Sequence, residues 1–405
     1  MSAQTDAGRP VAARVAAIDL LRGLVIVIMA LDHARDYFSV FPYQPTDLSQ
    51  ASATLFLTRW ITHFCAPVFV FLAGTSAWLH SHNAGLTQAA LQRFLLTRGL
   101  WLVFLELTWN SFMWRFDLDG VQVQVLWALG WSMVFLAVLL PLPRTAIVVI
   151  GAIIVGGHNL LDGIHAADFG APNSAAALAW DVLHEPHFGQ TASGFQFGIL
   201  YPLLPWIGVM ALGYGFGPVL AWERARRERC MAIAGLALIA LFLLLRLNNG
   251  YGESNPPGFG GGHVFAPNPR GALYTWLGLL NLSKYPPSLQ YLLMTLGPAL
   301  LLMPLLERWR GRGAEFFTVF GRVPMFFYLL HVPLIHLASV VATHLMFGDA
   351  AQNLNPQNPV LPGYTPSLVP VYLGWIAAVA ILYPACRWYA GYKQRHKDNR
   401  WLSYL

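Results

Sequence analysis

Ionisable side chains are dense in the first apolar run of the sequence, IDLLRGLVIVIMALDHARDYF. Spacings of three and four residues place one set of positions on a single helical face: Asp19, Arg22, Ile26, Met29, His33 and Asp36. On such a helix, His33 lies roughly 16 Å beyond Arg22. Two aspartates and an arginine stand within three positions of His33, which favours a functional role for this imidazole. Asp19 and Arg22 could equally cap and anchor the helix.

A histidine precedes a proline in the second apolar run, RWITHFCAPVFVFLAGTSAWL. Pro67 stands four residues after His63, and a proline inside a helix frees the carbonyl four positions before it. The spacing therefore predicts a kink with the His63 carbonyl released from the helix. Two interpretations of the imidazole stay open. It lines a polar pocket at the kink, or it satisfies the released backbone group.

Five further polar positions in or beside apolar runs are candidates for substrate binding: Glu106, Lys284, Tyr285, Tyr328 and His331. A carboxyl group within a span must be protonated or paired, so structural pairing competes with a binding role for Glu106. Lys284 and Tyr285 precede a proline pair at the mouth of a helix, although both are also ordinary interfacial residues. Tyr328 and His331 share one helical face.

The sequence favours no metal site. His331 and His336 are five residues apart and do not share a helical face. The stretch HEPH at 184–187 carries a proline between its possible ligands, and no second pair stands at a metal-ligand spacing. We therefore expect no bound metal.

The elements that must position these side chains are transmembrane helices. Of 405 residues, 56% are hydrophobic and 11% are charged, whereas soluble domains carry about 25% charged residues. Apolar runs recur along the whole chain, so we expect an all-α polytopic bundle of about ten spans. The runs lie near 18–38, 55–78, 99–112, 121–140, 145–156, 200–221, 231–246, 288–306, 316–344 and 368–386. Charges interrupt the first run, which indicates a retained span rather than a cleaved signal.

The distribution of lysine and arginine predicts the orientation. With the N-terminus inside, the inner segments hold seventeen Lys or Arg residues and the outer segments hold three, as expected for cytoplasmic loops. Both termini should therefore be cytoplasmic. We expect tails at 1–17 and 390–405 around a membrane domain at 18–389, with long outer loops at 157–199 and 247–287. The net charge of +6 is spread in short clusters, so no nucleic-acid partner is expected.

Four segments resemble the catalytic domain of the heparan-alpha-glucosaminide N-acetyltransferase family and its bacterial relatives: RVAAIDLLRGLVIVIMALDH, PVFVFLAGTS, NLSKYPPSLQYLL and VPMFFYLLH. The resemblance covers most of the chain, and the first segment is its most specific part. More loosely, the chain is similar to membrane acyltransferases that decorate surface glycans. The resemblance implies transfer of an acetyl group across the membrane, from cytosolic acetyl-CoA to an amino sugar or sugar hydroxyl on the far side.

The family's catalytic histidine cannot be transferred to this chain. The lysosomal enzyme carries an asparagine where His33 falls and its histidine in the following luminal stretch, but residues 39–55 contain no histidine here. We therefore expect His33 or His63 to act as a general base or as a transient acyl carrier. Asp32 or Asp36 would orient the imidazole.

The resemblance also implies contacts with the phosphate-bearing end of CoA, because a guanidinium group matches phosphate. The candidates at the cytoplasmic side are Asp19, Arg22, Arg93 and Arg98. The expected partners are the lipid bilayer, acyl-CoA and a glycan or amino-sugar acceptor, with a homo-oligomer also compatible. The expected location is a bacterial inner membrane.

Two other classes of function fit the same residues. Buried charges could form a proton or substrate path in a transporter or a lipid-handling protein. They could also be satisfied polar groups in a structural membrane protein. An acyltransferase should gain thermal stability from acetyl-CoA, whereas a transporter indifferent to CoA should not.

Overall fold

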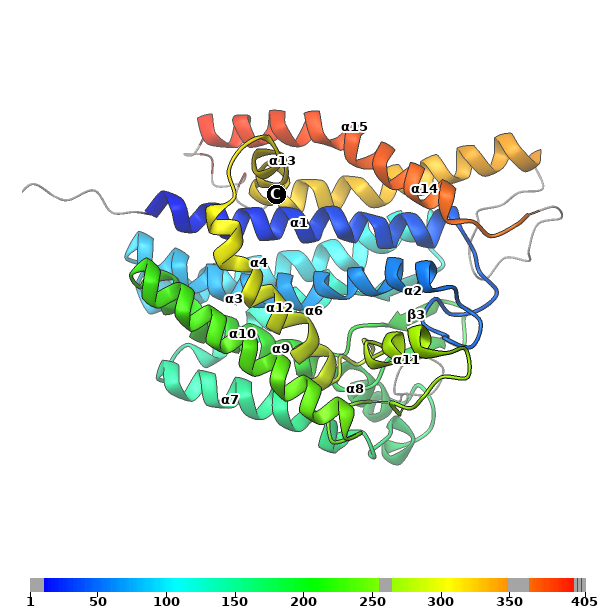
Figure 1. Ribbon diagram of the computed structural model, residues 1–405, viewed down its shortest axis with the longest axis horizontal. Helices are drawn as coiled ribbons and strands as arrows, with labels where there is room; N and C mark the ends of the chain where they lie inside the picture. The colour runs from blue at the N-terminus through cyan, green and yellow to red at the C-terminus, as the bar shows by residue number, and fades with distance from the viewer. Residues whose placement is uncertain (1–10, 255–263, 349–363, 397–398, 400–401, 403–405) are drawn as a thin grey trace, which may run out of the picture.

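The computed structural model describes residues 11–254, 264–348, 364–396, 399 and 402, and within them the chain forms a helical bundle (Figure 1). The long helices are α1 (Val11–Phe38), α3 (Cys65–Ala84), α4 (Gln88–Leu105), α6 (Val125–Leu139), α7 (Arg144–Gly157), α9 (Leu203–Phe216), α10 (Arg224–Leu247), α12 (Leu289–Arg308), α14 (Pro324–Phe347) and α15 (Leu368–Arg395). Shorter elements are α2 (Ala53–Trp60), η1 (Ile61–Phe64), η2 (Glu106–Asn110), α5 (Ser111–Arg115), η3 (His158–Leu161), η4 (Ala166–Phe169), α8 (Ala175–Leu183), η5 (Gly217–Ala221), α11 (Ala272–Leu279) and α13 (Arg312–Arg322).

Among the described residues, seven helical segments are long and apolar enough to cross a membrane. They begin with the continuous segment Ala53–Ala84, in which α2 passes through η1 into α3. The chain is therefore an integral membrane protein. Helices α1, α4 and α6 lie at three more of the predicted runs. The count of ten spans and the cytoplasmic location of both termini stay predictions.

The predicted run at 316–344 is two helices rather than one. Helix α13 ends at Arg322, and α14 begins at Pro324, which occupies the first helical position. A proline ring restricts the residue before it to non-helical conformations, and Val323 accordingly leaves the helical region with φ −131° and ψ 51°. Helix α1 begins at Val11 and α15 continues to Arg395, so helix extends into both segments predicted as tails.

Close backbone contacts pack α1 against α13. A Cβ atom added at Gly321 would collide with the Asp19 carbonyl, and one at Gly23 would collide with the Phe317 carbonyl. These two glycines therefore allow the helices to approach more closely than side chains would permit. The contact lies along the first half of α1 (Figure 1).

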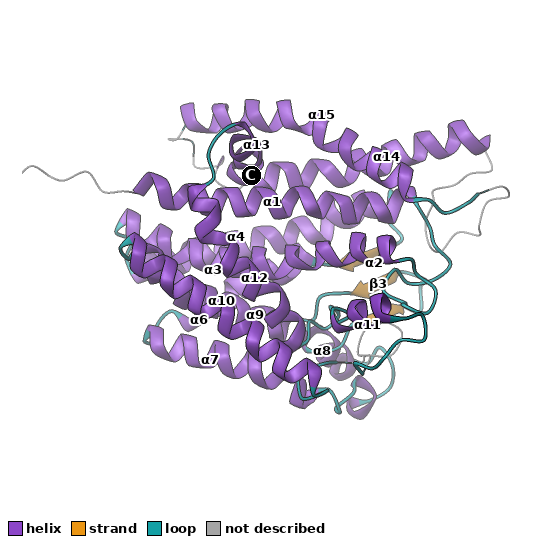
Figure 2. Cartoon of the chain, viewed as in Figure 1, coloured by secondary structure: helices purple, strands orange, loops and turns teal. Residues whose placement is uncertain are grey.

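A small sheet departs from the all-α expectation (Figure 2). Strands β1 (Gly120–Val123), β2 (His187–Gln190) and β3 (Gln196–Ile199) form a sheet in the order β1-β3-β2. Strand β3 pairs with β1 in parallel and with β2 antiparallel. The sheet lies at the end of the bundle where α1 finishes, opposite the α1–α13 contact.

Candidate functional site

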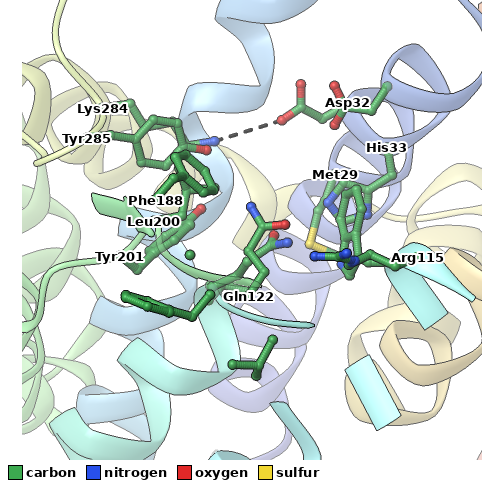
Figure 3. A pocket seen from close by; sticks show the side chains of 18 of the residues that line it. Met29, Asp32, His33, Arg115, Gln122, Phe188, Leu200, Tyr201, Lys284 and Tyr285 are labelled. Atoms are coloured by element: carbon green, nitrogen blue, oxygen red, sulfur yellow. Dashed lines mark ion pairs between the residues drawn. The ribbon is translucent and has the colours of Figure 1, made fainter. Parts of the chain in front are cut away.

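A cavity of about 850 Å³ opens beside the last turns of α1 (Figure 3). It is within the range of roughly 300–1,000 Å³ that is usual for small-molecule sites. Its lining includes the carboxylates of Asp32, Asp36 and Asp117, the cations of Arg115 and Lys284, and the imidazoles of His33 and His336. Met29 also lines the cavity, one helical turn before His33. The part of the α1 stripe from Met29 to Asp36 therefore faces a polar cavity, as predicted.

Asp32 is the centre of the charges in this cavity. Its carboxylate accepts hydrogen bonds from Arg59 at 2.7 Å and from Arg35 at 3.1 Å. Lys284 Nζ lies 3.8 Å from the same carboxylate and approaches from the opposite wall (Figure 3). Arg35 also donates to Asp36 at 2.7 Å. Because buried charges are tolerated only when they are paired, this network holds α1, α2 and the loop before α12 together.

His33 makes its closest polar contact with another histidine. His33 Nδ1 lies 2.7 Å from His331 Nε2, and the two rings stack with centroids 4.8 Å apart. His331 Nδ1 in turn lies 2.7 Å from the Tyr328 carbonyl and 3.1 Å from the Phe327 carbonyl. Trp114 packs its edge against the His33 ring. His331, which was predicted to bind substrate, therefore lies behind His33 and is not among the cavity-lining residues.

The sheet supplies a neutral polar wall to the cavity. The amide side chains that line it are Gln122, Gln124, Gln190 and Gln196. Aromatic rings stand beside them, among them Phe188 and Tyr201 (Figure 3). Amides that donate and accept, next to rings that offer an apolar face, suit a hydroxyl-rich ligand better than a highly charged one.

Lys284 and Tyr285 form the wall opposite His33 (Figure 3). Glu253 accepts hydrogen bonds from Ser283 N at 2.7 Å and from Ser288 Oγ at 2.7 Å, on either side of the pair. Burial raises the pKa of the Tyr285 phenol, but the cations of Lys284 and Arg59 outweigh it and leave this pKa below its ordinary value. The wall is thus cationic and can stabilise negative charge that develops in the cavity.

His63 confirms the predicted backbone defect but lies outside the cavity lining. Its carbonyl accepts a hydrogen bond from the Tyr291 hydroxyl at 2.7 Å, and the 3₁₀ turn Ile61–Phe64 interrupts the helix there. Tyr291, rather than the imidazole, therefore satisfies the carbonyl released by Pro67. The His63 ring is buried, and its Nδ1 has no hydrogen-bond partner among the described residues.

Glu106 lies away from the cavity and caps a helix. Its carboxyl oxygens accept hydrogen bonds from three backbone N–H groups at the start of α6, those of Gln124, Leu126 and Trp127, at 3.0 to 3.3 Å. Asn110 donates to it at 2.9 Å. These contacts match the structural alternative for Glu106. Tyr328 is likewise buried and outside the cavity lining.

None of the four candidate CoA contacts is among the residues that line the cavity. Arg22 donates to Asp19 at 3.2 Å, to the Gly321 carbonyl at 3.1 Å and to Ser76 Oγ at 3.0 Å. Both Arg93 and Arg98 lie on α4, where Arg93 is exposed and Arg98 is partly exposed. The lining of the cavity from α1 begins at Met29, so these residues do not reach it in this structure.

The histidines of the HEPH stretch take separate partners. His184 Nε2 donates to Asp162 at 3.0 Å, and His187 Nδ1 lies 3.7 Å from Asp181. Burial raises the pKa of the Asp162 carboxyl, but hydrogen bonds from His184, Asn159 and Ser254 outweigh it and hold this pKa below its usual value. Within the described ranges, no three His, Cys, Asp or Glu side chains gather in a group that could hold a metal ion.

Sequence reasoning missed several residues of the cavity. Arg59, which is the closest partner of Asp32, was visible only as a charge at the start of the second apolar run. Arg115 and Asp117, which form a 3.1 Å ion pair on the lining, were not among the candidates. The glutamines of the sheet gave no signal, because their strands are short and far apart in the chain. His336, five residues from His331, also lines the cavity.

A sequence model described as heparan-alpha-glucosaminide N-acetyltransferase, catalytic, matches residues 14–245, more than half of the chain. No curated protein matches the chain. The matched region contains Asp32, His33, Arg59 and the whole sheet, and it ends before Lys284 and His331. One side of the cavity thus lies inside the matched region and the opposite wall outside it. This chain belongs to the heparan-alpha-glucosaminide N-acetyltransferase catalytic-domain family.

Proposed function

We propose that this protein transfers an acetyl group from acetyl-CoA to a glycan or amino-sugar acceptor outside the cytoplasm, with His33 as the catalytic base. Its family suggests a membrane acetyltransferase. The observation that carries the finer proposal is the cavity, in which an accessible imidazole from the family-matched segment faces a cationic wall. We place the protein in a bacterial inner membrane, with its cavity toward the outer side.

The proposed reaction needs one base and one site for developing negative charge. The acceptor nitrogen or oxygen attacks the thioester carbonyl, so a new C–N or C–O bond forms while the acceptor proton passes to His33. The carbonyl oxygen becomes an oxyanion, and Lys284 with Tyr285 stabilises it. The C–S bond then breaks, and the CoA sulfur takes the proton back from His33. An imidazole is the usual group for such proton transfers near neutral pH.

The acceptor is proposed to lie against the sheet. The glutamines of β1, β2 and β3 offer neutral donors and acceptors, and all three carboxylates in the cavity lining are already paired with arginine. A free ammonium group on the acceptor would compete with these arginines for the carboxylates. The structure therefore fits an acceptor that enters with many hydroxyl groups and a neutral attacking amine or hydroxyl.

The donor is proposed to enter from the cytoplasmic side. Arg22, Arg93 and Arg98 lie toward that end and would meet the phosphates of CoA, as guanidinium groups commonly do. The lining begins at Met29, which lies seven positions after Arg22, or roughly 10 Å along the packed helix. We propose that the neighbouring helices separate there when the donor binds, as lids do in many enzymes.

Two routes of transfer remain within this proposal. In the direct route, His33 only removes the proton. In the other, His33 accepts the acetyl group first and passes it to the acceptor. His63 is the second candidate for either role, and its place outside the cavity lining favours His33.

The test is acetyl-CoA turnover by purified protein in detergent, with glucosamine as the acceptor probe. Release of the CoA thiol and the thermal unfolding midpoint would be measured for the wild type, His33→Gln and His80→Gln. His80 is the matched control because it is an exposed histidine on α3. Acetyl-CoA should stabilise all three proteins, and only His33→Gln should lose turnover, by about 10² to 10⁴-fold. Full turnover by folded His33→Gln would contradict the assignment of the base.

A further inference from the structure

The hydrogen bonds behind His33 form a directed chain. The Tyr328 and Phe327 carbonyls lie 2.7 and 3.1 Å from His331 Nδ1, and a carbonyl oxygen can only accept. His331 Nδ1 must therefore carry a proton. A neutral imidazole has one N–H, so His331 Nε2 is then an acceptor.

The same logic determines the protonation of His33. Its Nδ1 lies 2.7 Å from the acceptor His331 Nε2, so His33 Nδ1 must donate and carry the proton. His33 Nε2 is then unprotonated and holds a lone pair. This nitrogen makes no hydrogen bond to the described residues and is not sealed from solvent, while the ring lines the cavity.

A charged His331 would reverse the direction of this chain, and its surroundings oppose that charge. His331 is fully buried, with 0% of its surface exposed. It contacts two carbonyls, the His33 ring, and the rings of Phe327 and Tyr328. No carboxylate of the described residues pairs with it. Burying an imidazolium without a counter-charge is costly, so the neutral form is the stable one.

We propose that His331 is a positioning residue, which locks His33 in the Nδ1–H tautomer and so presents the Nε2 lone pair to the cavity. This proposal deepens the proposed function and rests on His33 being its base. Two carbonyls fix His331, and the stacked rings together with Trp114 fix the orientation of His33. A histidine here replaces the carboxylate that more often orients a catalytic imidazole. Asp32 and Asp36 hold arginines instead.

The direct test is the tautomer of His33 in the resting protein, which needs no activity. Protein labelled with ¹⁵N-histidine in bilayers at neutral pH would be studied by solid-state NMR. Thirteen histidines contribute, and the signals lost in His33→Gln identify those of His33. We expect a protonated Nδ1 and an unprotonated Nε2. A proton on His33 Nε2 in the wild type would overturn the proposal.

Two substitutions of His331 separate positioning from packing. In His331→Gln, the side-chain oxygen can still accept from His33 Nδ1 while the amide N–H donates to the carbonyls. In His331→Phe, a ring of similar size fills the space and offers no acceptor. We expect the glutamine variant to keep the Nδ1–H tautomer and to stay within about tenfold of wild-type turnover, and the phenylalanine variant to lose about 10²-fold.

The outcomes are distinguishable. Equal turnover by the two folded variants would refute positioning by His331. If His331→Phe does not fold, the tautomer in His331→Gln decides, because loss of the Nδ1–H form there contradicts the proposal. If the wild type shows the expected tautomer but does not turn over acetyl-CoA, the proposed function fails and the tautomer lock stands.

Discussion

Replacing Asp32 by asparagine should destabilise the protein strongly, because its carboxylate lies beside three buried cations. Arg59 and Arg35 donate to it at 2.7 and 3.1 Å, and Lys284 lies 3.8 Å away. Only 11% of the Asp32 side chain is exposed. Asparagine keeps the shape but not the charge, and its amide group turns donors toward a cation.

The expected size follows from these contacts. A hydrogen bond to a charged group contributes about 1.5–3 kcal/mol, and breaking a buried ion pair by removing one partner costs about 3–5 kcal/mol. Asp32→Asn removes the negative charge and leaves the cations without it, while one acceptor oxygen is kept. We therefore expect a loss of about 3–5 kcal/mol in the free energy of unfolding. Asp117→Asn is the matched control. Its ion pair with Arg115 lines the same cavity with 37% of the Asp117 side chain exposed, so its loss should be below about 1 kcal/mol.

The assay is reversible unfolding in mixed micelles, with a double-mutant cycle. Arg59→Met would be measured alone and in the Asp32→Asn background. Because the two residues share one contact, the second substitution should cost much less once the first is present, with a coupling of at least about 1 kcal/mol. Additive losses, or equal losses in Asp32→Asn and Asp117→Asn, would refute the assignment of Asp32 as the central counter-charge.

Three further outcomes are expected. Glu106→Ala should lower the unfolding free energy by about 3 kcal/mol or more, because three backbone donors at the start of α6 lose their acceptor. A loss below about 1 kcal/mol would contradict the role of Glu106 as the cap of α6. The depressed pKa of Asp162, whose hydrogen-bond donors outweigh its burial, stabilises the fold above the unfolded-state pKa of about 3.9. This contribution disappears as the pH falls through the lower folded pKa, so the unfolding midpoint should drop less for Asp162→Asn than for the wild type between about pH 5 and pH 3. Gly321→Ala should lower the free energy of unfolding by about 1–3 kcal/mol through overpacking. Gly156 has open space around it, so Gly156→Ala should not destabilise the protein. Equal effects of the two substitutions would contradict the close contact between α1 and α13.

The sequence predicted the parts of the site that depend on local spacing. The stripe on α1 placed Met29, His33 and Asp36 together, because helical periodicity is a local property. The proline rule located the freed carbonyl of His63, which the structure confirms. Neither pattern could identify the distant residue that His33 or the His63 carbonyl contacts. His331 lies 298 positions from His33, and spacing carries no information over that separation.

The parts that sequence reasoning missed are long-range or irregular. Strands β1 and β3 are each four residues long and 70 or more positions apart, so their pairing leaves no period to detect. The run at 316–344 appeared continuous in hydropathy, and only Pro324 marked the break. Glu106 could not be assigned to a binding or a capping role, because the donors it satisfies belong to another helix.

The network around α1 also constrains how this protein is made. Arg59 leaves the ribosome 27 residues after Asp32. His331 appears 298 residues after His33, which at about 5–20 residues per second is a delay of roughly 15–60 s. During that interval the first helix carries polar groups whose final neighbours do not yet exist, at a cost in lipid of a few kcal/mol. Its final position in the bilayer must therefore await the synthesis of His331.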